Sequence, residues 1–224
     1  HWTAEKYTVS AADGNTGLSI SELGENKATF GKDYEFTLTA EGGYNLPASV
    51  TISVGEKFYT LAVGAEGVVT IPAQYVTGNI TITANGVLIT YTITYVLDGG
   101  TNAENNPSSY TVTTETISLQ KAERTGYTFA GWYDAEENGN LVTEIEKGRT
   151  GNVTLYARWT ANRYTIAFED GTDDTVTGSM SSISATYGEA VSLTENTFER
   201  TGYTFLVWAR EENGNVVYDD KESV

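Results

Sequence analysis

Apolar and polar residues alternate in several short stretches of the first 87 residues. Every second position is apolar at 36–40, 50–54 and 80–84, with threonine or serine at the positions between. A period of two with one apolar face is typical of antiparallel sheets that face water on one side. Turn signals rich in glycine, asparagine and aspartate separate these stretches. We therefore predict a small immunoglobulin-like β-sandwich over 1–87, with one short helical turn at Pro72–Val76.

The same alternation continues beyond residue 87. Apolar or aromatic residues occupy every second position at 91–97 and again at 153–159, and Asp-Gly-Gly at 98–100 forces a turn after the first of these stretches. No stretch of 88–160 carries an apolar period of 3.6 residues over the length of a helix. Valine, isoleucine, threonine and tyrosine recur together, which favours strands. The chain is therefore predicted to be all-β.

A tandem duplication occupies the rest of the chain. The segment Glu123–Phe129 recurs as Glu199–Phe205, and each copy is followed at the same distance by a tryptophan. The copies repeat after about 75 residues, which divides this part of the chain into units at 88–160 and 161–224. The second unit has no counterpart of the closing strand-like stretch of the first. We therefore expect it to be incomplete, without its last strand and with an exposed sheet edge.

Charge narrows the range of partners. The 224 residues include 13 basic and 30 acidic ones, and the formal net charge is −17. Such a surface repels nucleic acid and anionic lipid, so neither is an expected partner, and self-repulsion favours a monomer. No stretch approaches the ~20 apolar residues of a membrane helix, so membrane insertion is not expected. The sequence begins at His1 without a signal peptide, which we interpret as a fragment whose signal peptide and anchor lie outside it.

The residue types needed for most catalytic sites are scarce. The chain has no cysteine, which removes disulfides, thiolate metal sites and cysteine nucleophiles. Its only histidine is His1, so a serine triad and a zinc site both lack their imidazoles. Most acidic residues lie in turn-like segments such as 134–137 and 169–174, where paired carboxylates seldom acquire the shifted pKa values that a glycosidase needs. We expect no enzyme activity, no catalytic residue and no cofactor.

Two polar groups of residues nevertheless suggest specific chemistry. Segment 170–174, Asp-Gly-Thr-Asp-Asp, has enough oxygen ligands for calcium, but it lacks the spacing and closing glutamate of an EF-hand loop, and a polar turn is the favoured interpretation. Lys6, with Asn79 or Asn85 and with Glu35 nearby, could close an intramolecular Lys–Asn amide bond. Ordinary exposed residues are the favoured interpretation of this second set. No metal site is assigned.

Six aromatic residues gather around the duplicated segment in its first copy. They are Tyr127, Phe129, Trp132, Tyr133, Tyr156 and Trp159. Large aromatics dominate the cores of small β domains, and recurrence of the motif favours a core role. A platform on which a sugar ring stacks is the alternative, and it requires exposed rings. Gly131 suggests a bulge that would place Phe129 and Trp132 on one face, although the second copy has Val207 there.

Three spaced motifs link the duplicated unit to a known family. They are Leu97–Gly100, Arg124–Tyr133 and Leu155–Trp159, and the match to the family pattern that they anchor extends over nearly all of 88–160. With these motifs the unit resembles the Listeria–Bacteroides repeat, also known as the internalin B-repeat family, and the copy at 161–224 resembles it in part. The resemblance implies a compact β-grasp-like fold with a reduced helix. It also implies a place in tandem arrays on bacterial surface proteins, as spacers or adhesion modules.

The expected architecture is an immunoglobulin-like sandwich followed by two β-grasp-like repeats, and residues 1–87 resemble the immunoglobulin-like modules of bacterial surface proteins. The leading functional hypothesis is a non-catalytic stalk or adhesion module outside the cell, at the cell surface, since arrays of small folded units make natural spacers. A module that binds a host glycan or host protein through exposed aromatics is the alternative. A third hypothesis is a set of accessory domains of a larger secreted enzyme.

Overall fold

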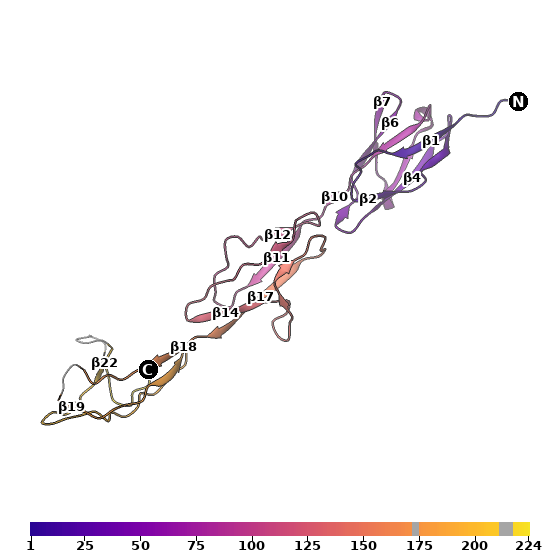
Figure 1. Cartoon of the computed structure of the whole chain (residues 1–224). Helices are drawn as coiled ribbons and strands as arrows, with labels where there is room; N and C mark the ends of the chain where they lie inside the picture. Colours follow the sequence, from indigo (N-terminus) through magenta and orange to yellow (C-terminus); the bar gives the residue numbers. More distant parts are fainter. Residues whose placement is uncertain (172–174, 211–216) are drawn as a thin grey trace. The chain divides into compact units, whose positions relative to one another are not determined.

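The computed structural model describes residues 1–171, 175–210 and 217–224 (Figure 1). By the density of their internal contacts, the residues form two compact units. The first comprises His1–Thr94, Pro107–Leu119 and Thr143–Thr154, and the second comprises Tyr95–Asn106, Gln120–Val142 and Leu155–Val224. The division runs through the first repeat.

Two sheets make up the N-terminal part of the chain, where Figure 1 labels five of their strands. One sheet has the strand order β3-β1-β9-β6-β7 and the other has the order β2-β4-β8. The strands are β1 (Lys6–Ala11), β2 (Leu18–Ile20), β3 (Gly24–Thr29), β4 (Tyr34–Ala40), β6 (Ser49–Val54), β7 (Lys57–Ala62), β8 (Val68–Ile71) and β9 (Ile80–Thr83). Val9 and Ile52 of the first sheet share one buried core with Phe36 and Ile71 of the second. Two sheets around one core form a β-sandwich, as the alternation predicted.

One strand pairing of the sandwich departs from the expected antiparallel pattern. Strand β1 runs parallel to β9, with Val9 opposite Ile80, whereas β6 pairs antiparallel with both β7 and β9. Alternation shows which face of a strand is buried, but parallel and antiparallel ladders share the same side-chain period of two. The direction of β1 relative to β9 was therefore not readable from the sequence.

Helical structure in the described residues is limited to two short 3-10 turns. They are η1 (Ala65–Gly67) and η2 (Ala73–Tyr75). The turn η2 lies inside the helical turn predicted at Pro72–Val76, which is confirmed. The turn η1 was not predicted, and it contains two residues with positive φ, Glu66 and Gly67.

The first repeat contains a five-stranded sheet and a separate strand pair. The sheet has the order β12-β11-β17-β14-β15, and β13 pairs with β16. The strands are β11 (Tyr91–Val96), β12 (Ser109–Tyr110), β13 (Ile117–Ser118), β14 (Tyr127–Tyr133), β15 (Leu141–Val142), β16 (Glu144–Ile145) and β17 (Val153–Ala161). Just before them along the chain, β10 (Val87–Leu88) forms a separate pair with β5 (Tyr44–Asn45). Strand β17 lies in the middle of the sheet, and its Leu155 is fully buried. No residue of 88–160, all of which the structure describes, is helical, so even the reduced helix implied by the resemblance is absent there.

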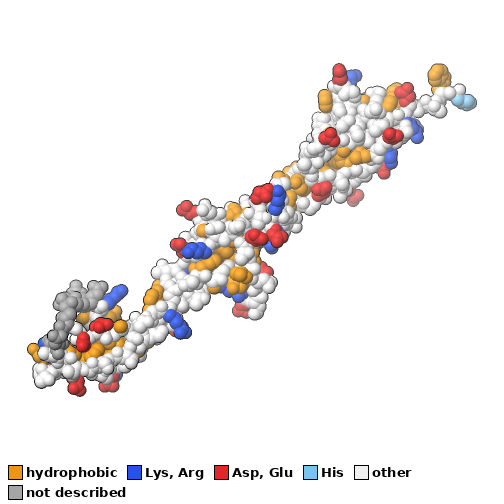
Figure 2. Space-filling view, in the orientation of Figure 1, with side chains coloured by type: hydrophobic (Ala, Val, Ile, Leu, Met, Phe, Trp, Pro, Cys, Tyr) orange, Lys and Arg blue, Asp and Glu red, His pale blue; other side chains and the backbone are white. Residues whose placement is uncertain are grey.

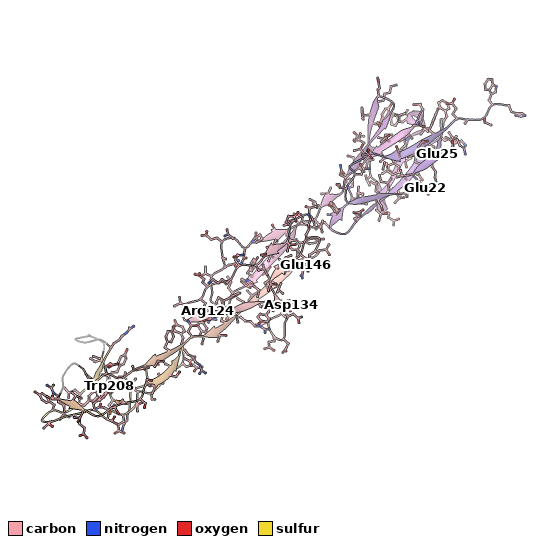
Figure 3. The ribbon with its side chains drawn as sticks, viewed as in Figure 1. Glu22, Glu25, Arg124, Asp134, Glu146 and Trp208 are labelled. Carbon is pink, nitrogen blue, oxygen red and sulfur yellow. The ribbon has the colours of Figure 1, made fainter. Side chains whose placement is uncertain are left out.

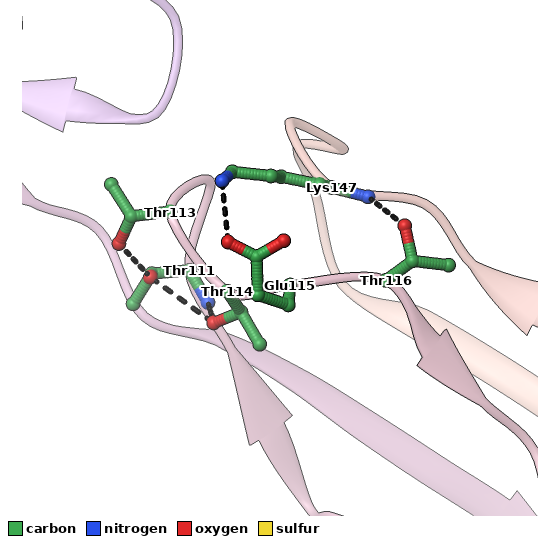
Figure 4. A network of polar contacts seen from close by, with 6 residues as sticks. All are labelled: Thr111, Thr113, Thr114, Glu115, Thr116 and Lys147. Atoms are coloured by element: carbon green, nitrogen blue, oxygen red, sulfur yellow. Dashed lines mark hydrogen bonds and ion pairs between the residues drawn. The ribbon is translucent and has the colours of Figure 1, made fainter.

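A polar network supports the connection between β12 and β13 (Figure 4). The backbone N–H of Thr111 donates to Thr114 Oγ1 at 2.9 Å, and Lys147 donates from its backbone N–H to Thr116 Oγ1 at 3.2 Å. The ammonium of Lys147 also pairs with Glu115, although both side chains are largely exposed. Exposed ion pairs contribute at most about 1 kcal/mol, so this network shapes a turn more than it stabilises the fold.

The second repeat consists of short strand pairs. They are β18 (Arg163–Ile166) with β20 (Ile183–Thr186), β19 (Val176–Thr177) with β21 (Glu199–Arg200), and β22 (Trp208–Ala209) with β23 (Val217–Tyr218). Across the described ranges, every regular element apart from the two 3-10 turns is a strand. The predicted all-β class is confirmed.

Candidate functional site: the corner where the repeat motifs meet

The duplicated Arg-Thr-Gly-Tyr segment forms a tight turn at the start of β14. The backbone N–H of Tyr127 donates to the Arg124 carbonyl at 3.1 Å. Between them Gly126 has φ +78°, a left-handed conformation that glycine adopts without strain. The Arg124 guanidinium then lies over the Tyr127 ring, 4.0 Å from its centroid. The segment therefore combines a turn with a cation–π contact.

The Asp-Gly-Gly segment after β11 forms a second turn, and the side chain of Arg124, which is labelled in Figure 3, joins the two turns. The backbone N–H of Gly100 donates to the Leu97 carbonyl at 3.0 Å. Asp98 and Gly99 both have positive φ, as the central residues of a type I′ turn do. Arg124 Nη1 lies 2.9 Å from Asp98 Oδ2. Because the Asp98 side chain is largely exposed, this ion pair contributes little energy and mainly orients the guanidinium.

Trp159 in the closing strand β17 packs against this second turn. Its indole Nε1 donates to the Leu97 carbonyl at 3.0 Å. A Cβ at Gly100 would lie 2.4 Å from the Trp159 ring, so a glycine is needed for the ring to approach. The three motifs that carry the family resemblance therefore meet at one corner of the repeat.

A β-bulge in β14 turns two aromatic rings towards the same side of the sheet. The register between β14 and β17 shifts between Phe129 and Gly131, and Gly131 has φ +138°. The rings of Phe129 and Trp132 lie edge to face with centroids 5.3 Å apart, and Phe129 is equally close to Trp159. The predicted bulge is confirmed, and it explains how residues three positions apart share a face.

Trp132 is the buried centre of this aromatic cluster. Only 2% of its surface is exposed. Its Nε1 donates to the Gln120 carbonyl at 2.9 Å, and the Tyr95 ring meets it edge-on at 5.1 Å. Burial raises the pKa of the Tyr95 hydroxyl above its ordinary value. A buried indole with its N–H satisfied is a core residue.

Reasoning from the sequence missed the polar partner of this core, Asn106. This side chain is buried, and its amide exchanges two hydrogen bonds with the backbone of Gln120, at 2.9 and 2.8 Å. The Gln120 carbonyl thus accepts from both Asn106 and Trp132. Asn106 follows the mostly polar segment 102–105, Asn-Ala-Glu-Asn, which resembles an ordinary loop. Nothing in the sequence distinguishes it from its exposed neighbours.

None of the three tryptophans of the repeats is exposed. Trp132 is buried, and Trp159 and Trp208 are partly buried. The remaining candidates, Tyr127, Phe129, Tyr133 and Tyr156, are partly buried as well. The Arg158 guanidinium covers the Tyr133 ring at 3.8 Å. A sugar ring stacks on an open aromatic face, and these residues serve instead as core and edge contacts of the repeat.

The acidic segments serve as turns where the structure describes them. Asp134, which is labelled in Figure 3, accepts hydrogen bonds from the backbone and side-chain nitrogens of Asn140, at 2.6 and 3.2 Å, and these bonds close the loop after β14. Of the candidate calcium segment, residues 172–174 lie outside the described residues. In the part of the chain that is described, no three histidine or acidic residues gather closely enough to hold a metal ion.

The residues considered for a Lys–Asn amide bond are all exposed. Lys6 lies in β1 and Glu35 in β4, whereas Asn79 and Asn85 flank β9. The side-chain oxygens of Asn79 and Asn85 accept hydrogen bonds from the backbone of residues 8 and 16, each at 3.0 Å. An amine attacks an amide in its neutral form, which burial favours. The structure provides no such burial at these four positions.

The second copy rebuilds the turn of the first. The backbone N–H of Tyr203 donates to the Arg200 carbonyl at 3.1 Å, with Gly202 at φ +79° between them. The Arg200 guanidinium lies 3.9 Å from the centroid of the Tyr203 ring. The same local sequence therefore produces the same turn and the same cation–π contact in both copies.

Comparisons with known proteins identify relatives that are much longer. A protein of Evansella cellulosilytica whose name describes a membrane protein is 30% identical over 129 residues, which cover 56% of this chain and 18% of the relative. Internalin H of Listeria monocytogenes is 35% identical over 97 residues, which cover 42% of this chain and 16% of the relative. The chain thus spans less than a fifth of either relative.

No solved structure shows significant similarity to this chain. No helix among the described residues has the length and apolarity to cross a membrane.

The family model of the Listeria–Bacteroides repeat domain matches residues 91–158 and 164–224, which is more than half of the chain. Each matched segment contains one copy of the turn that Arg124 and Arg200 form with the tyrosine three positions later. This chain therefore belongs to the Listeria–Bacteroides repeat family, and it carries the repeat twice in tandem.

Proposed function

We propose that the chain is a non-catalytic module of the bacterial cell surface that works as a stalk or adhesion segment. The observation that carries the proposal is the use of the repeat motif inside the fold. Arg124 and Gly126 build a turn, Gly100 admits the ring of Trp159, and Trp132 is buried in the core. A motif of this kind specifies a small folded unit, and tandem arrays of such units act as spacers.

The location at the cell surface is supported by the relatives and by charge. One relative has a name that describes a membrane protein and another is named internalin H. The net charge of −17 favours solubility and discourages contact with nucleic acid or anionic lipid. On the face shown in Figure 2, red acidic side chains are scattered over the surface together with blue basic ones. Such a surface suits a segment that projects into solvent.

The absence of enzyme activity is part of the proposal and rests on the chemistry of the side chains. The sequence has one histidine, at position 1, and no cysteine. The carboxylate of Asp134 is engaged in closing a turn with Asn140. A general acid–base pair needs two titratable groups positioned against a substrate, and no such pair emerges from these contacts.

A module that binds a host glycan or protein is the second candidate function. It is favoured by the second repeat, where Tyr203 is 67% exposed and Leu206 is 81% exposed. Accessory domains of a larger secreted enzyme are a third possibility that is compatible with relatives several times longer than this chain.

Display on a Gram-positive cell would separate the first two functions. The chain is placed between an N-terminal epitope tag and a wall anchor, and antibody access to the tag and adherence to host cells are both measured. For a stalk, deleting the chain should reduce tag access, and an unrelated all-β spacer of equal length should restore it without changing adherence. The binding module would instead be supported, and the stalk refuted, by two results together. The spacer would fail to restore adherence, and replacement of Tyr203 and Leu206 by serine would also remove it.

A further inference from the structure

The joint between the sandwich and the first repeat and the joint between the two repeats contain the same kind of turn. It spans residues 41–44 in the sandwich and residues 124–127 in the first repeat, and in each turn the last residue donates its backbone N–H to the first carbonyl at 3.1 Å. The third residue is Gly43, with φ +90°, or Gly126, with φ +78°. In both turns a tyrosine follows this glycine and begins a strand, β5 or β14. We call the two segments Gly-Tyr turns.

The linker that enters each repeat forms a hydrogen bond with the glycine of one Gly-Tyr turn. Ile89, which directly follows β10, donates its backbone N–H to the Gly43 carbonyl at 2.9 Å, and Asn162, which directly follows β17, donates to the Gly126 carbonyl at 2.9 Å. Since β10 pairs with β5 and β17 pairs with β14, each bond extends an existing ladder by one step. Both donors lie two residues before the Tyr-Thr-Ile segment that opens a repeat. The two linkers therefore use equivalent positions.

A side chain of each repeat occupies the space beside the same glycine. A Cβ at Gly43 would lie less than 3.0 Å from the side chain of Val112, and a Cβ at Gly126 would lie less than 3.0 Å from the ring of Tyr187. Each of these side chains lies two residues after the strand partner of the tyrosine in its repeat's Tyr-Thr-Ile segment. Val112 and Tyr187 are therefore equivalent positions, and both approaches need a bare Cα.

Further contacts hold the second joint. The backbone N–H of Tyr187 donates to the Asn162 carbonyl at 2.9 Å, and the Thr128 hydroxyl donates to Asn162 Oδ1 at 2.7 Å. The Tyr187 ring also meets the Tyr127 ring edge to face, with centroids 5.5 Å apart. A flexible linker is a place where few contacts cross. Here the boundary between the two compact units runs inside the first repeat and through neither joint.

We propose that the start of each repeat is a docking surface for the Gly-Tyr turn of the domain before it, and that the docked joint restricts bending. The partner needs only a carbonyl and a bare Cα on a left-handed glycine, so domains of unrelated fold can supply it. This requirement explains how the same repeat follows a sandwich at Gly43 and another repeat at Gly126. The proposal does not depend on the stalk function, because a binding module built of these domains would have the same joints.

The first test measures hydrogen exchange of single amides by NMR in the intact chain labelled with ¹⁵N. Tyr187→Ala should speed exchange of the Asn162 amide at least about tenfold, while the amides of β18 and β20 report that the second repeat stays folded. Tyr164→Ala is the matched control, because Tyr164 is 50% exposed, close to the 41% of Tyr187, and lies in the adjacent strand β18. Val112→Ala should act in the same way on the Ile89 amide.

Gly126→Ala approaches the joint from the other side. It should also speed exchange at Asn162, because the new methyl group displaces the Tyr187 ring. Gly202→Ala is its control: Gly202 occupies the same turn in the second copy with φ +79°, and no described atom lies within 4 Å of a Cβ there. In a Tyr187→Ala background, Gly126→Ala should add little, since the overlap is gone. If Tyr187→Ala unfolded the second repeat, the comparison of Gly126→Ala with Gly202→Ala would decide alone.

The second test measures bending directly. Because the sequence has no cysteine, spin labels can be attached at Ala130→Cys and Ser184→Cys, which are exposed positions in β14 and β20. The distance distribution between the labels should be narrow, and Tyr187→Ala should broaden it. The proposal is overturned if the distribution is equally broad with and without the Tyr187 ring. It is also overturned if the Asn162 amide exchanges as in an unstructured peptide, or if Tyr187→Ala affects this amide no more than Tyr164→Ala does.

Discussion

Replacing Gly131 by alanine tests how the bulge organises the first repeat. Gly131 has φ +138°, and a residue other than glycine in such a region costs roughly 1–3 kcal/mol. A Cβ there would also lie 2.4 Å from Leu141 Cδ1, but the Leu141 side chain is 57% exposed and can turn away. The backbone strain therefore dominates. We expect a loss of about 2 kcal/mol, which corresponds to about 8–16 °C in Tm for a domain of this size.

The measurement must report on the first repeat alone. The intact chain contains several folded parts, and a single two-state transition is not expected for it. Hydrogen exchange of peptides from β14 and β17, followed by mass spectrometry in increasing denaturant, gives the free energy of opening of this sheet. Ala130→Val is the matched control, because Ala130 is the exposed neighbour of Gly131 without a positive φ. Valine suits a strand, so the control should change stability by less than about 0.5 kcal/mol.

Equal stability of Gly131→Ala and Ala130→Val would refute this reasoning. It would mean that alanine is accommodated at the bulge and that the bulge does not depend on glycine. The second repeat provides a further comparison, since Val207 stands at the corresponding position and belongs to no strand. Val207→Gly should therefore leave the exchange rates of the second repeat nearly unchanged.

Truncation of Trp132 to alanine should lower the free energy of unfolding of the first repeat by about 3–5 kcal/mol in the same exchange assay. By contrast, Trp2→Ala should have no effect because Trp2 is fully exposed. Burial raises the pKa of Tyr95, so the folded repeat holds this proton more tightly than the unfolded chain. The resulting stability is complete below about pH 10 and is lost as the pH rises through the folded pKa, and Tyr95→Phe should reduce that alkaline loss in melting profiles. The intact mass should equal that of the sequence, without the loss of ammonia that an amide bond to the exposed Lys6 would cause.

Much of the local structure could be predicted from the sequence. The alternation at 36–40 and 80–84 corresponds to β4 and β9, with Phe36, Leu38, Ile80 and Ile82 buried. Gly131 indicated a bulge because few other residues adopt its conformation. These features depend on residues that are neighbours in the sequence, so a local pattern is enough to reveal them.

Other features depended on segments that are far apart in the sequence. The parallel pairing of β1 with β9 and the buried contact of Asn106 with Gln120 had no local signal. A side-chain pattern shows that a strand exists but does not show its neighbour or its direction. Similarly, a polar side chain becomes buried only when a distant partner satisfies its hydrogen bonds.

The two copies of the repeat separate what the sequence determines from what the tertiary structure decides. The Arg-Thr-Gly-Tyr segment forms the same turn at Arg124 and at Arg200, because its hydrogen bond and its positive φ lie within four residues. The tryptophan that follows is buried in one copy, at Trp132, and only partly buried in the other, at Trp208. This difference in burial goes together with the central strand β17. That strand covers the aromatic cluster in the first copy and has no counterpart among the described residues of the second. Local sequence sets backbone conformation, whereas burial depends on which distant strand packs alongside.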